Sequence, residues 1–146
     1  MVERFNDECN NLKPPAIAEP VRITRVSVRR LDDILCEPNI SRVDFLKLDA
    51  EGAELSVLYG AMKLLNRSPR PATLVEVQEQ DIRTKPWGDA AREVLHFLMR
   101  IDYQWFAIAA KGALLPISCN LKTCDANLVA LPIERTEGFL SLLAQK

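Results

Sequence analysis

The sequence predicts an α/β domain whose mostly parallel sheet is covered by helices on both faces. Segments rich in β-branched residues alternate with segments of helical periodicity, which is typical of that class. The chain has 146 residues, enough for one domain with a sizeable core. Its last two expected strands follow one another without a helix between them, so we expect a hairpin and one strand antiparallel to the rest.

The elements are expected in a regular order along the chain. A proline-rich polar arm is predicted over 1–20, followed by the domain over 21–146. Strands are predicted over 21–28, 43–49, 72–79, 103–110 and 127–132. Helices are predicted as a short turn before Pro38 and over 53–66, 89–101 and 136–146, and the segment 111–116 is expected to turn away from the sheet.

Composition excludes several classes of function. A net charge of −1 argues against a nucleic-acid or membrane-surface footprint. No apolar run approaches the roughly 20 residues of a membrane span, and the polar, acidic start of the chain is not a signal peptide. The four cysteines form neither a C-x-x-C pair nor a zinc pattern, so we expect reduced thiols in a cytoplasmic protein.

Carboxylates crowd the turn between the second expected strand and the helix after it. Asp49, Glu51 and Glu54 lie there, together with Lys47 and Gly52, in the stretch "KLDAEGAE". Glycine allows a tight backbone bend at such a point. Ligands in open α/β sheets bind beyond the carboxyl ends of strands, so this turn is a candidate site.

A structural interpretation of the same turn stays open. Asp49 or Glu51 can cap the helix, Glu54 can complement its dipole, and Lys47 can pair with one of the carboxylates. The density of carboxylates favours a site instead, because one cap needs one acceptor. If the next strand is a neighbour, Glu76 joins the same rim, where gathered carboxylates can act as a base or attract a cation.

Other polar and aromatic residues are expected to be structural. The pair Asp32–Asp33 is interpreted as negative charge at a helix N-terminus. Trp105 is expected in the core or in a pocket wall.

A longer ordered motif surrounds the acidic turn. "LDDIL" at 31–35 is followed by "VDFLKLDAEGAELSVLYGAMKLL" and then by "PATLVEVQE". These stretches resemble the FkbM family of S-adenosylmethionine-dependent methyltransferases. The family hallmark K-x-D-x-E-G-x-E and a helix ending in G-A-x-x-x-L match here, as does a carboxylate in the next strand.

The resemblance implies the C-terminal half of a Rossmann-like class I methyltransferase sheet, with 43–49 as its fourth strand. It implies S-adenosylmethionine as cofactor, a hydroxyl-bearing small molecule as acceptor, and O-methyl transfer. The implied residue roles follow the motif. Catalysis falls to Asp49, Glu51 and Glu76, cofactor binding to Asp49 and Gly52, and substrate or structural support to Lys47 and Glu54. No feature requires a metal.

The family's glycine-rich cofactor turn is missing from this sequence. None of the five glycines forms a G-x-G or G-x-x-G pair. Three interpretations follow: a fragment of a full enzyme, a half completed by another polypeptide, or a non-catalytic interaction domain. Strand 43–49 would then present an open edge, which predicts a homodimer or a partner chain unless 21–28 covers it.

Overall fold

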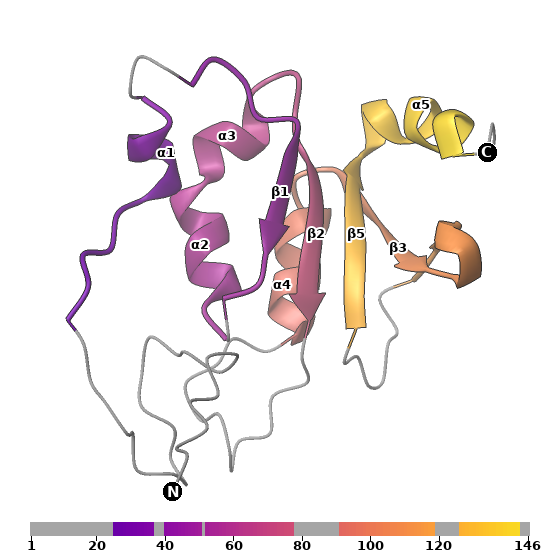
Figure 1. Cartoon of the computed structure of the whole chain (residues 1–146), viewed down its shortest axis with the longest axis horizontal. Coiled ribbons are helices and arrows are strands. Elements are labelled where there is room, and N and C mark those ends of the chain that lie inside the picture. Colours follow the sequence, from indigo (N-terminus) through magenta and orange to yellow (C-terminus); the bar gives the residue numbers. More distant parts are fainter. Residues whose placement is uncertain (1–24, 37–39, 51, 78–90, 119–125, 144–146) are drawn as a thin grey trace, which may run out of the picture.

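The computed structural model describes residues 25–36, 40–50, 52–77, 91–118 and 126–143. One mixed sheet with flanking helices forms the structure, which confirms the α/β class (Figure 1). Every helix in these ranges is too short or too polar to span a lipid bilayer. The arm predicted over 1–20 lies outside the described residues.

The elements have the following bounds. The strands are β1 (Phe45–Leu48), β2 (Ala72–Val77), β3 (Tyr103–Ile108), β4 (Leu114–Pro116) and β5 (Ala126–Pro132). The helices are α1 (Leu31–Ile34), α2 (Glu54–Gly60), α3 (Met62–Asn66), α4 (Ala91–Met99), α5 (Ile133–Leu143) and the 3₁₀ helix η2 (Ala110–Gly112).

The strand order in the sheet is β1-β2-β5-β3-β4. Strands β1 and β2 pair in parallel, whereas β5 is antiparallel to both of its neighbours, β2 and β3. The antiparallel strand expected near the chain's end is therefore present. The prediction that 111–116 turns away from the sheet is wrong in part. Leu114–Pro116 returns to the sheet as β4 and pairs antiparallel with β3.

Each face of the sheet is covered by different helices. Helices α2, α3 and α4 pack on one face, and their shared core includes Leu48, Leu58, Leu65, Val75, Val77, Leu98, Trp105 and Leu128. On the other face Ala72, Phe106 and Leu131 pack against Phe139 and Leu140 of α5. Alternation of side chains along each strand separates the two sets.

The strand expected over 21–28 is not found in its described part, Arg25–Val28. Val26 and Val28 are 62% and 74% exposed there. β-Branched residues favour a strand when a pleated surface packs against them, and these two valines have no such cover from the described residues. Within the described part of the chain, β1 therefore pairs with β2 alone.

The single helix expected over 53–66 is divided in two at Ala61. Its backbone (φ −113°, ψ 14°) ends α2 and begins α3. Two N–H groups at the start of α3 are paired by Asp32, which is 3% exposed. One carboxylate oxygen accepts from the Lys63 N–H at 2.9 Å and the other from the Leu64 N–H at 3.0 Å. Asp32 thus caps α3, whereas its own helix α1 has no side-chain cap.

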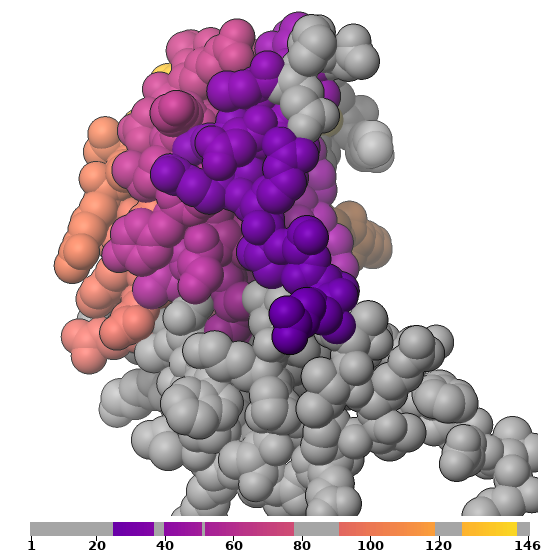
Figure 2. All heavy atoms as spheres, turned by 90° about the vertical axis from the view of Figure 1, so that its left-hand side faces the viewer, coloured from indigo at the N-terminus to yellow at the C-terminus, as the bar shows by residue number. Residues whose placement is uncertain are grey.

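Helix α1 lies across the junction of α2 and α3. Figure 2 shows the indigo segment that contains α1 resting on the magenta helices. A side chain added at Gly60 would meet the backbone of Arg30 and Leu31 at 3.6 Å, an ordinary contact distance. The "GA" pair of the motif therefore sits where α1 approaches α2 and where the helix breaks.

Candidate functional site

The carboxyl ends of β1 and β2 lie side by side at one edge of the sheet. Their parallel ladder runs to the pair Leu48 and Val75. One step further, the same register places Asp49 next to Glu76, on the face that α5 covers only at its other end. The sequence expectation that these two carboxylates share a rim agrees with this register.

Lys47 binds the first of these carboxylates. Its Nζ donates to Asp49 Oδ2 at 2.6 Å, and the two side chains are 57% and 33% exposed. The hydrogen bond to Asp49 and the charge of Asp49 raise the pKa of Lys47, and the nearby charge of Glu76 adds to the increase. Lys47 therefore stays cationic at neutral pH and lies within the field of both carboxylates.

Glu54 holds the turn itself together. Its Oε1 accepts from the N–H of Ala50 at 3.0 Å and from the N–H of Gly52 at 3.2 Å, and the residue is 7% exposed. Gly52 has φ +94°, a conformation that a side chain disfavours. This geometry fits the structural role rather than substrate contact for Glu54.

The rim extends over a third strand that sequence reasoning missed. Asn127 on β5 lies opposite Glu76 and is exposed. Its amide adds a neutral donor and acceptor next to the carboxylates. Asn127 begins the strand that was expected from the sequence, but its partner depends on the antiparallel insertion of β5 beside β2.

The remaining predicted site residue, Glu51, lies outside the described residues. Within the described ranges no group of three or more His, Cys, Asp or Glu side chains is placed to hold a metal ion. The site that can be described is therefore a rim of one lysine, two carboxylates and one amide over three strand ends.

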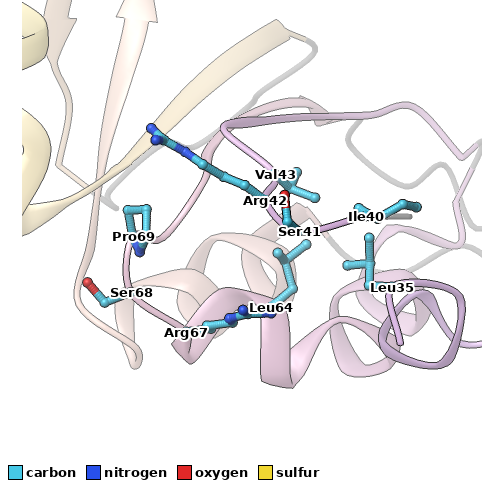
Figure 3. A pocket seen from close by; sticks show the side chains of 9 residues that line it. All are labelled: Leu35, Ile40, Ser41, Arg42, Val43, Leu64, Arg67, Ser68 and Pro69. Carbon is cyan, nitrogen blue, oxygen red and sulfur yellow. The ribbon is translucent and has the colours of Figure 1, made fainter. Parts of the chain in front are cut away.

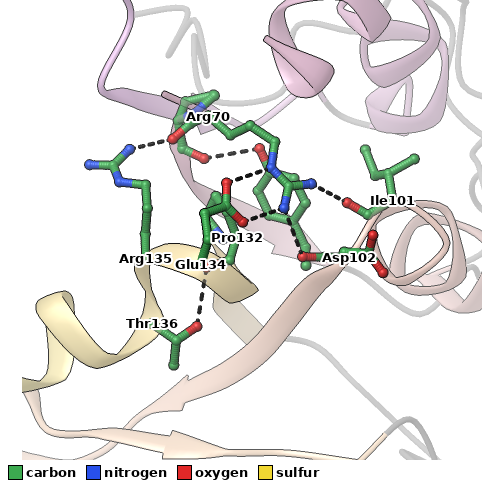
Figure 4. A network of polar contacts seen from close by, with 9 residues as sticks. Arg70, Ile101, Asp102, Pro132, Glu134, Arg135 and Thr136 are labelled. Atoms are coloured by element: carbon green, nitrogen blue, oxygen red, sulfur yellow. Dashed lines mark hydrogen bonds and ion pairs between the residues drawn. The ribbon is translucent and has the colours of Figure 1, made fainter. Parts of the chain in front are cut away.

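A second polar cluster lies at the opposite end of the sheet, where it fastens α5 (Figure 4). Arg70 donates its Nε to Glu134 at 2.8 Å and also binds the carbonyl of Ile101. Its guanidinium stacks on the Tyr103 ring at 5.1 Å. The hydroxyl of Tyr103 donates to the Pro71 carbonyl at 3.1 Å. These contacts satisfy the cluster internally and support a structural role.

Comparison with known proteins points to a single family. The profile of the methyltransferase FkbM domain matches residues 5–104. A curated relative, Methyltransferase 1 of Beauveria bassiana (strain ARSEF 2860), is 57% identical over 37 residues. The matched stretch is 25% of this chain and 15% of the relative. No solved structure matches the chain.

Proposed function

Since the chain belongs to the FkbM family of methyltransferases, we propose that it provides the acceptor side of an S-adenosylmethionine-dependent O-methyl transfer. The observation that carries the proposal is the rim of Lys47, Asp49 and Glu76 at two adjacent strand ends. Carboxylates at the carboxyl ends of parallel strands are placed where such sheets bind ligands.

The rim residues fit a cationic cofactor. S-adenosylmethionine, when bound, supplies an electrophilic methyl group on a positively charged sulfonium. Asp49 and Glu76 place negative charge at the rim, and the turn at Gly52 offers backbone without a side chain. Asp49 and Gly52 are therefore the residues of this chain that would lie nearest the cofactor.

The same carboxylates are suited to remove the proton of the acceptor hydroxyl. In the proposed step Asp49 would take the proton of the acceptor hydroxyl, and the hydroxyl oxygen would bond to the methyl carbon as the carbon–sulfur bond of the donor breaks and leaves a neutral thioether. Lys47 fixes the orientation of that carboxylate through the 2.6 Å hydrogen bond. Glu51 is the alternative base, and Glu76 is a second base or a contact to the acceptor. Positioning of the hydroxyl is the larger requirement, because good alignment can lower a barrier by about 7–11 kcal/mol, whereas a general base typically contributes about 10²–10⁴-fold in rate.

We also propose that the site is completed across the open edge of β1, by a homodimer or a partner chain. The crossover helices that connect the described strands, α2, α3 and α4, all lie on one face of the sheet. A ligand crevice of the usual kind forms where neighbouring crossovers lie on opposite faces. A strand added beside β1, with its helix on the uncovered face, would create such a crevice next to Asp49. A stable monomer in light scattering would count against this proposal unless residues 1–24 cover the edge.

Calorimetric titration with S-adenosylmethionine tests the cofactor proposal. We expect weak binding by this chain and a marked loss of affinity in Asp49→Asn. Asp44→Asn is the matched control, since Asp44 lies before the other end of β1 and pairs with Arg42. Absence of binding would favour a non-catalytic interaction domain or a half that needs its partner. Full turnover after the equivalent Asp→Asn change in a complete homologous enzyme would refute Asp49 as the base.

A further inference from the structure

A pocket of about 100 Å³ lies at the amino-terminal ends of β1 and β2, at the other end of the strands from the acidic rim (Figure 3). It is bounded by the end of α1, by the segment that leads into β1, and by the loop between α3 and β2. Its lining residues are Leu35, Ile40, Ser41, Arg42, Val43, Leu64, Arg67, Ser68 and Pro69.

Most of the surface that lines the pocket is apolar. Leu64 lies beneath it and is 8% exposed, while Ile40 at its margin is 39% exposed. Leu35, Val43 and Pro69 complete the apolar lining. The volume suits one aliphatic side chain, because the apolar residues of the lining would remove such a side chain from water.

Positive charge borders this apolar hollow. Arg67 is exposed and has no salt-bridge partner among the described residues. Lys63 lies on α3, whose C-cap is Arg67, and is also exposed. Arg42 stands on the facing side of the pocket and pairs with Asp44. A ligand that binds over the pocket would be complementary in charge if it carried carboxylates next to these exposed cations.

We propose that this pocket is a docking site for an acidic polypeptide segment, which inserts one apolar side chain between Arg42 and Arg67. The apolar lining supplies affinity, and the exposed cations Lys63 and Arg67 supply selectivity for acidic flanks. Since the rim of Asp49 lies at the other end of the sheet, the bound segment leaves that site accessible. The docking site is therefore independent of methyl transfer.

The test is an NMR titration of the ¹⁵N-labelled chain with a short acidic peptide that carries one central leucine. We expect shift changes confined to the pocket residues. Replacing the peptide's leucine by serine, or changing Arg67→Glu or Ile40→Asp in the protein, should weaken binding by about tenfold or more. Arg100→Glu is the control, because it makes the same charge change at an exposed position at the end of α4.

Several outcomes would overturn the proposal. They are no shift change at millimolar peptide, equal binding of the serine peptide, and equal binding by the Arg67→Glu variant. Inorganic phosphate that reproduces the same shifts would show a simple anion site instead. Vesicles of phosphatidylserine that compete with the peptide would show non-specific charge, because they carry no leucine anchor.

Discussion

Replacing Asp32 with alanine should destabilise the fold although this residue is far from the proposed site. The Asp32 carboxylate is 3% exposed and accepts the N–H groups of Lys63 and Leu64 at 2.9 and 3.0 Å. Neither α3 nor its N-cap Ala61 provides another side-chain cap. Alanine would therefore leave two donors without their acceptor at a buried helix junction.

The size of the effect follows from the two lost hydrogen bonds. Loss of an N-cap typically costs about 1 kcal/mol, and a buried donor left unpaired costs about 1–3 kcal/mol. The Leu64 N–H lies in a buried hydrogen bond, whereas the Lys63 N–H is partly buried and regains a water. We expect a loss of about 2–3 kcal/mol in the free energy of unfolding, or roughly 5–10 °C in Tm for a domain of this size.

Urea unfolding followed by far-UV circular dichroism measures this loss. Asp33→Ala is the matched control, because Asp33 is the next residue of the same helix and is exposed. Its free energy of unfolding should stay within about 0.5 kcal/mol of the wild type. Asp32→Asn, which keeps one acceptor oxygen, should fall between the two. If Asp32→Ala and Asp33→Ala unfold at the same urea concentration, Asp32 does not cap α3.

Two further predictions concern pH. Glu134 has its pKa lowered by the hydrogen bond from Arg70, so its stabilising effect is full above the unfolded value of about 4.3 and disappears as the pH falls through the lower folded value. Glu134→Gln should flatten the acid limb of a plot of stability against pH; an unchanged limb would show that the pair contributes nothing, as exposed pairs often do. Burial raises the pKa of Tyr103 to about 12, so the stability that this neutral phenol contributes is present below the unfolded value of about 10 and is lost as the pH rises. In a pH titration followed by ultraviolet absorbance, the difference between wild type and Tyr103→Phe should show that this phenol ionises near pH 12. Ionisation near pH 10 would contradict its burial.

The helices and strands were predictable where burial has a local period. Leu58 and Leu65 belong to the same apolar stripe and are both fully buried, and the expected helix forms over most of its length. The break at Ala61 was not predictable, because the carboxylate that caps the second part lies 31 residues before Lys63. The exposed Val26 and Val28 show the converse error, where strand propensity lacks a surface to pack against.

The site was predictable along each strand and less so between strands. Asp49 and Glu76 were expected on one rim from the assumption that consecutive parallel strands are neighbours, and the β1–β2 ladder has that order. Asn127 could not be placed, because its position opposite Glu76 depends on β5 inserting between β2 and β3. Such an insertion is set by packing of the whole sheet and leaves no local pattern.

The acidic motif therefore combines two kinds of residue, which mutation can separate. Glu54 is buried and pairs the N–H groups of Ala50 and Gly52, so Glu54→Ala should lower stability by about 1–3 kcal/mol. Asp49 is partly exposed and paired with an exposed Lys47, so Asp49→Asn should change stability by less than about 1 kcal/mol while weakening cofactor binding. Equal stability losses in the two variants would mean that Asp49, like Glu54, serves to stabilise the fold. That result would contradict the proposed functional role of the rim.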